Sequence, residues 1–265
     1  MRDAGMGYSY GPVNPKEYFT MSDSIAAARA DLAPTGTLRV GINFSNILLT
    51  ARDPVTRAPS GVALDLAHEL GSRLGVPVEI VSYESAGALA ESAGSGAWQV
   101  GFLGIEPKRA NEISFTAPYV EIESTYLVPP DSPLQAIAEV DRTGIRIAIT
   151  AKAAYDLYLT RTLQHATLTR AAGADATFKL FLAEKMDALA GLKPQLEMYQ
   201  EKLPGSRILE GRFTAVQQAA GTPKGHAAGA RYLAEFIEDV KATGLVARTI
   251  EKNRIRGLAV APAAK

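Results

Sequence analysis

The sequence of 265 residues contains no cysteine. The chain therefore has no disulfide framework, no thiolate nucleophile and no cysteine-ligated metal or iron–sulfur cluster. An excess of one charge is missing too, because 28 Lys and Arg residues balance 28 Asp and Glu residues. Without a basic excess, we expect no general affinity for nucleic acid or anionic lipid. No segment approaches the roughly 18 apolar residues of a membrane-spanning helix, so none is predicted.

Motifs for phosphate or metal binding are also missing from the sequence. Neither G-x-x-x-x-G-K-[ST] nor G-x-G-x-x-G occurs, so nothing indicates nucleotide binding. The three histidines, His68, His165 and His226, are far apart and lack the paired spacing of a metal site, and we expect them to face solvent. The sequence therefore predicts neither a metal nor a cofactor.

The first twenty residues lack the charged region, apolar core and cleavage pattern of a secretory signal. They are rich in Gly, Pro and Tyr, which indicates a tail. An Ala-rich helix is predicted at 25–32, so residues 1–36 are interpreted as an N-terminal tail with a short helix.

The length of the chain suggests two compact units, or one unit with two lobes. From Thr37 onward, short β-type runs alternate with amphipathic helical runs, which is typical of an α/β fold with parallel strands. One helix is predicted from the i+4 spacing of Val62, Leu66, Leu70 and Leu74. Strands are predicted at 37–42, 77–83, 98–105, 122–128, 144–150, 166–169, 186–190 and 212–220. Further helices are predicted at 86–93, at 153–163, around Phe178 and Phe181, and at 232–240.

Pro129 and Pro130 break the strand predicted at 122–128 and mark a boundary between lobes. Lobe 1 is predicted at 37–128 plus 220–254, and lobe 2 at 129–219 with hinge strands at both ends. A C-terminal tail is predicted at 255–265, and its residues 259–265 are expected to be frayed. The chain is expected to cross between the lobes twice. This predicts a cleft between the lobes, which would close around a small ligand.

The run FLGIEPKRANEISFTAPY at 102–119 resembles the signature of type II periplasmic solute-binding proteins of the amino-acid family, extracellular solute-binding protein family 3. The resemblance extends to LRVG at 38–41 and GVALDLA at 61–67, and covers about 37–253. It implies a two-lobed type II α/β fold, in which each lobe is a mainly parallel sheet flanked by helices.

Proteins of this family serve ABC importers. The resemblance implies a non-enzymatic binding protein that closes two lobes on a small carboxylate-bearing ligand, either amino-acid-like or an organic acid. The implied partners are that ligand and a membrane permease, and we expect a monomer. The implied location is the periplasm, and the cytoplasm is the alternative because no export signal is recognisable.

In the family, the Arg of this motif pairs with the ligand's carboxylate, which carries over to Arg109. Its guanidinium is a planar, permanently charged fork that matches a carboxylate. The alternative is a solvated arginine at a helix start. A cation at a helix start opposes the macrodipole, and a ligand carboxylate would compensate it.

The sequence departs from the family pattern at several positions. Gly104 and Ile105 stand where relatives often carry hydroxyl groups, so recognition would depend on backbone amides. Asn46 stands where an aromatic ring commonly covers the ligand; Phe44 could replace that ring or belong to the core. The expected ligand-binding residues are Asn43, Phe44, Asn46, Phe102, Gly104, Ile105 and Arg109 in lobe 1, with Lys152, Ala153, Tyr155, Gly191 and Lys193 in lobe 2.

Leu192 aligns with an Asp that accepts hydrogen bonds from an amino acid's ammonium in the family. An apolar residue cannot balance a desolvated ammonium, so a conventional α-amino acid is not expected as the ligand. Lys152 and Lys193 follow strands of the second sheet, where clefts gather ligand contacts, and they favour an anionic ligand. The alternative is that both lysines face solvent.

Two weaker sets of candidates remain. Glu121 and Glu123 face one side of a hinge strand and are either cleft acids or salt-bridge partners, while Gln217 and Gln218 could hydrogen-bond a ligand. One alternative function is an enzyme similar to cyclohexadienyl dehydratase, for which only Glu121, Glu123, Lys152 and Tyr155 could supply a general acid. A non-exported ligand sensor is the other alternative.

Overall fold

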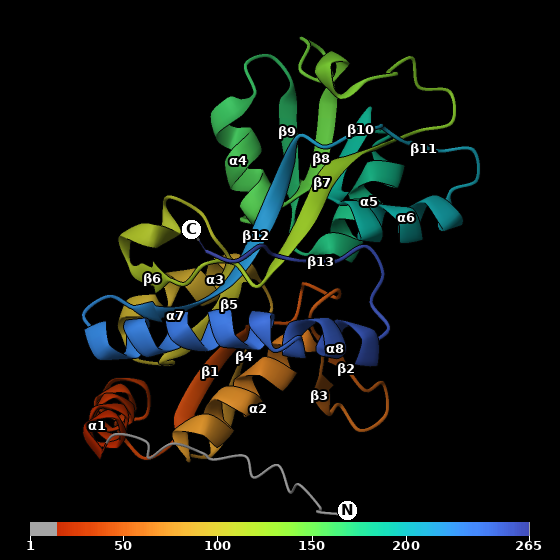
Figure 1. The fold of residues 1–265 in the computed structure, drawn as a ribbon. Helices are drawn as coiled ribbons and strands as arrows, with labels where there is room; N and C mark the ends of the chain where they lie inside the picture. Colours follow the sequence, from red (N-terminus) through yellow and green to blue (C-terminus); the bar gives the residue numbers. More distant parts are fainter. Residues whose placement is uncertain (1–14, 265) are drawn as a thin grey trace, which may run out of the picture.

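A computed structural model describes residues 15–264, with side chains described from Ser24 onward. The chain folds into two lobes that share one eleven-stranded sheet, with strands in the order β4-β1-β5-β12-β7-β10-β8-β9 (Figure 1). The first three strands belong to lobe 1 and the last three to lobe 2. The two-lobed α/β architecture predicted from the sequence is therefore present.

Each lobe is built on three parallel strands. In lobe 1, β1 (Leu38–Asn43) pairs with β4 and β5; in lobe 2, β8 (Arg146–Thr150) pairs with β9 and β10. The other strands of these two groups are β4 (Val78–Tyr83), β5 (Val100–Gly104), β9 (Thr167–Ala171) and β10 (Ala188–Leu192). The carboxyl ends of both sets face the space between the lobes, where Asn43, Gly104, Thr150 and Leu192 end their strands.

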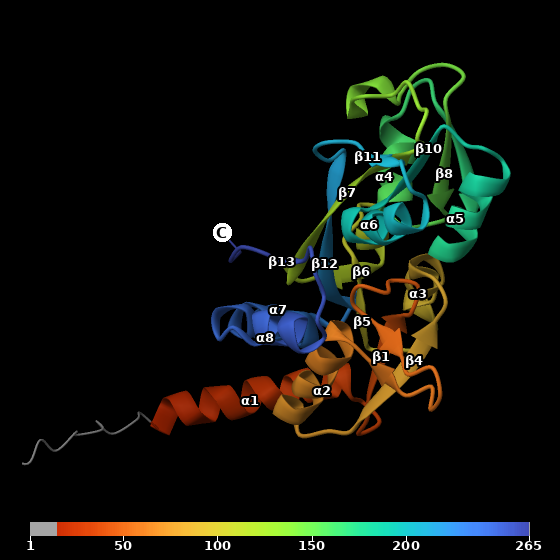
Figure 2. The ribbon, with the colours of Figure 1, turned by 90° about the vertical axis from the view of Figure 1, so that its right-hand side faces the viewer.

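The lobes are joined by β7 (Val120–Val128) and β12 (Thr214–Pro223), which pair in antiparallel fashion. Figure 2 shows these two strands running together from one lobe into the other. Each also pairs with a strand of one lobe, β12 with β5 of lobe 1 and β7 with β10 of lobe 2. A two-stranded joint of this kind can bend without breaking either sheet.

The helices of lobe 1 pack around its sheet. The buried face of α2 includes Val62, Leu66, Leu70 and Leu74, and Gly75 ends the helix in the left-handed conformation with φ 65°. These helices are α1 (Pro15–Leu32), α2 (Val62–Leu74), α3 (Ala86–Glu91), α7 (Ala227–Ala242) and α8 (Leu245–Lys252). The helix spacing read from the sequence is thus realised in α2.

Lobe 2 contains α4 (Ala154–Thr162), α5 (Ala174–Ala183) and α6 (Lys193–Lys202), each of which directly follows a strand. Three short 3₁₀ helices occur: η1 (Ala93–Ser95), η2 (Arg109–Asn111) and η3 (Ile137–Glu139). The remaining short strands are β2 (Ala51–Arg52), β3 (Pro59–Ser60), β6 (Ile113–Phe115), β11 (Arg207–Ile208) and β13 (Ala259–Val260).

Several boundaries differ from those expected. Helix α1 begins at Pro15, within the segment expected to be a tail, and residues 1–14 lie outside the described residues. Helices α6 and α8 were not predicted, β10 lies two residues later than expected, and β12 continues to Pro223. The C-terminal segment expected to be frayed contains β13, which pairs with β7, and the Ala261 N–H donates to the Tyr119 carbonyl. Backbone pairing with a hinge strand orders a segment whose sequence shows no strand pattern.

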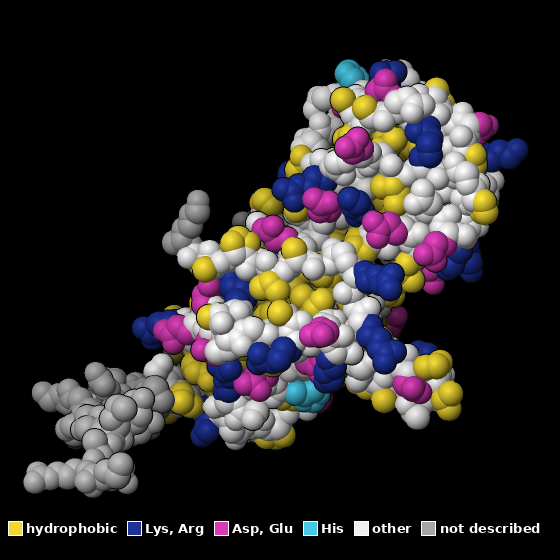
Figure 3. Space-filling model, turned by 45° about the vertical axis from the view of Figure 1, so that its right-hand side comes forward, with side chains coloured by type: hydrophobic (Ala, Val, Ile, Leu, Met, Phe, Trp, Pro, Cys, Tyr) yellow, Lys and Arg dark blue, Asp and Glu magenta, His cyan; other side chains and the backbone are white. Residues whose placement is uncertain are grey.

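Acidic and basic side chains are interspersed on the face shown in Figure 3, as expected for a chain of zero net charge. Within residues 15–264, no helix combines the length and apolar character needed to cross a bilayer.

Candidate functional site

A cavity of about 60 Å³ lies between the lobes at the carboxyl ends of the parallel strands. Both lobes and the hinge strand β12 contribute to its wall. Of the residues predicted to bind ligand, those that line this cavity are Asn43, Asn46, Phe102, Gly104, Arg109, Ala153 and Tyr155. The remaining predicted residues, Phe44, Ile105, Lys152, Gly191 and Lys193, are not part of its lining.

Helices α2 to α6 all begin at the cavity. Their first residues contribute to the wall: Ala63 in α2, Ala86 in α3, Ala154 in α4, Ala174 in α5 and Gln195 in α6. A helix N-terminus carries a partial positive charge, roughly half an elementary charge, and unpaired backbone N–H groups. The longer of these helices, α2, α4, α5 and α6, therefore direct partial positive charge at the wall, offset in part by a first-turn aspartate in α2, α4 and α5.

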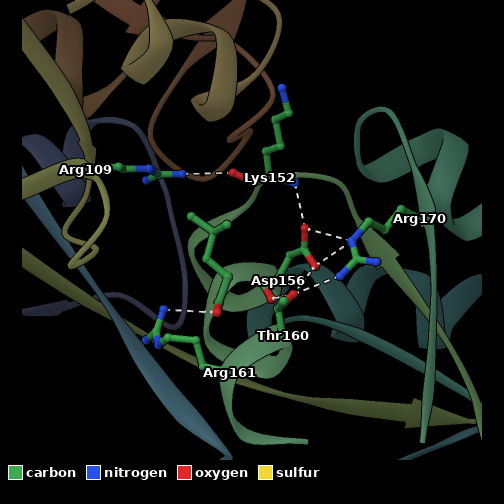
Figure 4. Close-up of polar contacts among 7 residues, drawn as sticks. Arg109, Lys152, Asp156, Thr160, Arg161 and Arg170 are labelled. Carbon is green, nitrogen blue, oxygen red and sulfur yellow. Dashed lines mark hydrogen bonds and ion pairs between the residues drawn. The ribbon is translucent and has the colours of Figure 1, made fainter.

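Arg109 directs its guanidinium across the space between the lobes (Figure 4). Its Nη1 donates to the Gly104 carbonyl at 2.7 Å within lobe 1, and its Nη2 donates to the Lys152 carbonyl at 2.9 Å in lobe 2. The residue is only 6% exposed. Two carbonyl oxygens satisfy part of its hydrogen-bonding capacity but do not neutralise its charge.

No carboxylate of the described residues forms an ion pair with Arg109. Glu106, whose charge acts on Arg109, forms its ion pair with Arg161 instead, at 2.5 Å. Burial lowers the pKa of Arg109 to about 10, and Glu106 only partly offsets this effect. A buried cation without a counter-charge is unfavourable, so an anion bound beside Arg109 would stabilise it.

Lys152 holds the carbonyl that faces Arg109. Its backbone has φ 58°, a left-handed conformation that is costly for a residue with a side chain. The conformation is held by Asp156, whose Oδ2 accepts from the Lys152 backbone N–H at 2.8 Å, and Asp156 in turn accepts from Arg170 at 3.0 Å. The Lys152 ammonium lies outside the cavity lining and pairs with Glu91 of α3 at 2.6 Å.

The lobes touch at further points around the cavity. The Arg161–Glu106 pair joins α4 of lobe 2 to the segment after β5 in lobe 1. Gly87 of α3 lies so close to Lys152 that an added Cβ would be 2.6 Å from the Lys152 Cβ. Similarly, a Cβ on Gly104 would be 3.1 Å from that of Ala154. The structure is therefore in a closed arrangement.

Neutral polar groups form much of the remaining wall. Gln218, on β12, is 6% exposed, and its side-chain amide forms no hydrogen bond within the described residues. Asn43 Oδ1 accepts from the N–H and the hydroxyl of Ser45, so the Asn43 amide nitrogen remains available. Burial raises the pKa of Tyr155 to about 12, so its hydroxyl stays neutral and serves as a hydrogen-bonding group.

Two predicted residues of lobe 1 have other roles. The Arg52 guanidinium carbon lies 3.8 Å from the centre of the Phe44 ring, so this ring is covered by an arginine. Ile105 donates its backbone N–H to the Gln217 carbonyl at 2.8 Å, which fixes β5 to the hinge strand. Neither residue is part of the cavity wall.

The same is true of two predicted residues of lobe 2. Gly191 is buried within β10, where an added Cβ would be 2.9 Å from Leu196. Lys193 begins α6, and its ammonium lies 3.4 Å from a carboxylate oxygen of Glu123. The expectation that Lys152 and Lys193 supply positive charge to the cavity is therefore not supported by their positions, because acids on the outside of the cleft hold both ammonium groups.

The weaker candidates also lie outside the cavity lining, apart from Gln218. Glu121 accepts from the Gln217 amide at 3.1 Å, and Glu123 pairs with Arg212 as well as Lys193. The exposed histidines His68 and His165 and the half-buried His226 belong to no metal-binding cluster within residues 15–264.

Sequence reasoning missed several residues of the wall. Gln195 lies in the first turn of α6, a helix that the sequence did not reveal, although Pro194 near its start is typical of a helix N-terminus. Tyr119 ends the motif and is fully buried against the cavity, and its hydroxyl has no partner within the described residues. The hydroxyl residues Ser45, Thr50, Ser85 and Thr150 also line the wall.

Comparison with known proteins places this geometry in a family. The model for bacterial extracellular solute-binding proteins, family 3, matches residues 38–254. A search of curated protein sequences gives no significant match.

Three solved structures illustrate the shared fold. The solute receptor for L-cysteine of Neisseria gonorrhoeae has a TM-score of 0.74 at 21% identity, over 88% of this chain and 95% of its own. A substrate-binding protein of an amino acid ABC transporter from Streptococcus pneumoniae, bound to L-arginine, has a TM-score of 0.72 at 20% identity, over 89% and 99%. An ancestral amino-acid-binding protein, described as a precursor of cyclohexadienyl dehydratase, has a TM-score of 0.71 at 20% identity, over 83% and 96%.

The likeness to these structures shows the fold, and the family match covers most of the chain. The protein belongs to the bacterial extracellular solute-binding proteins, family 3, and has their two-lobed type II fold.

Proposed function

We propose that the protein is the substrate-binding component of an ABC-type importer and closes its lobes on a small carboxylate-bearing ligand. The observation that carries this proposal is the buried guanidinium of Arg109, which lies at the cavity wall without a carboxylate partner among the described residues. Family membership supports the transport role, with a membrane permease as partner and an extracellular or periplasmic location. A monomer suffices for this role, because the cavity is formed within one chain.

A ligand carboxylate would stabilise the closed arrangement by contacting both lobes at once. Arg109 belongs to lobe 1, whereas the start of α4, at Ala153 and Ala154, belongs to lobe 2. A carboxylate between them would accept hydrogen bonds from the guanidinium and face the positive end of the helix. Closure then depends on the ligand, which is the property that a transporter can recognise.

Catalysis on this scaffold has weaker support. Of the four residues considered as general acids, Glu121, Glu123 and Lys152 do not line the cavity. Tyr155 does line it, but burial raises its pKa to about 12, far from the value that suits a general acid at neutral pH. The observation that favours this second function, a dehydratase-like enzyme, is the structural likeness to an ancestral precursor of cyclohexadienyl dehydratase.

Thermal unfolding in the presence of matched acids and amides tests the proposal. A panel of hydroxy, oxo, amino, dicarboxylic and simple carboxylic acids is compared with neutral amides, for example lactate with lactamide. A binding acid at 100 times its Kd should raise the free energy of unfolding by about 2.7 kcal/mol, and hence the Tm by several degrees. Its amide should have no effect, because a neutral group does not compensate Arg109.

The variant Arg109→Met should lose this response, whereas Arg142→Met, which removes an arginine outside the cavity lining, should keep it. Equal Tm shifts in wild type and Arg109→Met, or no response to any carboxylate, would contradict the proposal. Incubation of the best acid with the protein, followed by analysis for a new product, tests the enzymatic alternative.

A further inference from the structure

The described part of the cavity wall carries one charged side chain, and its charge is positive. Among the described residues that line it, Arg109 is the only one that is charged at neutral pH, and none is Asp or Glu. The wall is otherwise made of apolar side chains, hydroxyls and amides. The starts of helices α2, α4, α5 and α6 add partial positive charge, which an aspartate in the first turn of α2, α4 and α5 offsets in part. A cationic group on a ligand would thus meet no counter-charge.

Acidic residues do occur just behind this wall, but each is engaged elsewhere. Glu106 pairs with Arg161 at 2.5 Å, and Asp156 holds Arg170 and the Lys152 backbone N–H. Asp175, in the first turn of α5, accepts a hydrogen bond from the Tyr199 hydroxyl at 3.1 Å. None of these carboxylates lines the cavity, so none is placed in the wall to accept hydrogen bonds from a ligand ammonium.

The groups that remain free suit a neutral polar or apolar ligand body. The amide of Gln218 and the amide nitrogen of Asn43 can hydrogen-bond a hydroxyl or an oxo oxygen. Phe102, Leu192 and Val216 provide apolar surface beside them. The small volume of the closed cavity, about 60 Å³, favours a ligand with few non-hydrogen atoms.

We infer that the ligand is a small monocarboxylic acid whose other groups are uncharged, such as a hydroxy or oxo acid, and that the site rejects the amino acid of the same shape. The inference rests on the proposed function and specifies its ligand class. Arg109 and the helix starts compensate one carboxylate, whereas an ammonium in the same cavity would be desolvated, would find no carboxylate in the wall and would lie near the Arg109 charge.

Isothermal titration calorimetry with three matched sets tests this selectivity. The sets are L-lactate, pyruvate and L-alanine; 2-hydroxyisocaproate, 4-methyl-2-oxopentanoate and L-leucine; and phenyllactate, phenylpyruvate and L-phenylalanine. In every set that binds, the hydroxy or oxo acid should bind at least about 100-fold more tightly than the amino acid, the order of magnitude expected for an unpaired buried ammonium.

A pair of adjacent variants locates the origin of the selectivity. Gln218→Glu places a carboxylate in the wall with almost no change of shape, and should lower the preference for the hydroxy or oxo acid by at least about 10-fold. Gln217→Glu adds the same charge one residue earlier, where the side chain is exposed and outside the wall, and should leave the preference unchanged. The Tm of each variant shows that it is folded.

The outcomes separate this inference from the proposed function. If an amino acid binds as tightly as its hydroxy or oxo counterpart, the inference is wrong while the carboxylate-binding function stands. If succinate or malate binds more tightly than every monocarboxylate, the uncharged ligand body is contradicted. If no carboxylate of any class binds, the proposed function fails, and the inference fails with it.

Discussion

Lys152 shows how one backbone conformation can connect the lobes. Its φ of 58° turns its carbonyl toward Arg109 and its ammonium toward Glu91, so both interactions across the cleft depend on a left-handed residue. A left-handed conformation costs a residue with a Cβ about 1–2 kcal/mol, and glycine avoids that cost.

We therefore expect Lys152→Gly to have a higher free energy of unfolding than Lys152→Ala, by about 1 kcal/mol. Both variants lose the exposed ion pair with Glu91, so the comparison isolates the backbone effect. Urea unfolding of the two variants measures it. If the alanine variant were equally stable, residue 152 would not be strained in solution.

At the residue scale, the sequence predicted the identity of the cation but not the side-chain directions around it. Arg109 stands out because its motif resembles that of a family. Lys152 and Lys193 follow strands at the expected sheet edge, yet their ammonium groups contact Glu91 and Glu123. Those acids lie about 60 and 70 residues away along the chain, so only the tertiary structure reveals which charges meet.

The start of helix α4 depends on a network centred on Asp156. Its carboxylate accepts from the Lys152 backbone N–H and the Arg170 guanidinium, and Thr160 donates to both its carbonyl and its carboxylate (Figure 4). The Asp156 side chain is only 4% exposed, so water does not readily replace these partners. The network fixes the loop that carries the Lys152 carbonyl into the cleft.

The substitution Asp156→Asn should lower the free energy of unfolding by about 1–3 kcal/mol, because an amide lacks the charge that holds Arg170 and can accept at one oxygen only. The exposed residue Asp131 provides the control, since Asp131→Asn should change stability by less than about 0.5 kcal/mol. Chemical denaturation compares the two. Equal stabilities would show that Asp156 does not fix the start of α4.

At the element scale, the sequence predicted the elements with clear periodicity and missed those defined by packing. The i+4 spacing of apolar residues predicted α2, and the alternation of β-type with helical runs predicted most strands and helices of the α/β core. Helix α6 begins at the residue after β10 ends, so no loop residues in the sequence mark the change from strand to helix. Strand β13 is only two residues long and forms because the backbone of β7 has unpaired groups with which it can pair.

Closure of the whole molecule requires small residues where the lobes touch. Gly87 of α3 leaves room for the Lys152 side chain, and an added Cβ would lie within 2.6 Å of it. Gly94, in the same lobe, has no atom within 4 Å of an added Cβ. The two glycines therefore form a matched pair for testing closure.

Gly87→Leu should hold the lobes apart, whereas Gly94→Leu should not. In small-angle X-ray scattering, a binding acid should reduce the radius of gyration of wild type but not that of Gly87→Leu. Its affinity for that acid should fall by at least about 10-fold, because the closed state becomes less populated. Wild-type compaction and affinity in Gly87→Leu would contradict the closed arrangement described here.

A crystal structure with the tightest-binding acid tests most directly whether Arg109 receives a carboxylate between the lobes. We expect a carboxylate oxygen about 2.7–3.2 Å from a guanidinium nitrogen of Arg109, with the acid also touching the start of α4 in lobe 2. An acid bound elsewhere, with the guanidinium still donating only to the Gly104 and Lys152 carbonyls, would contradict it.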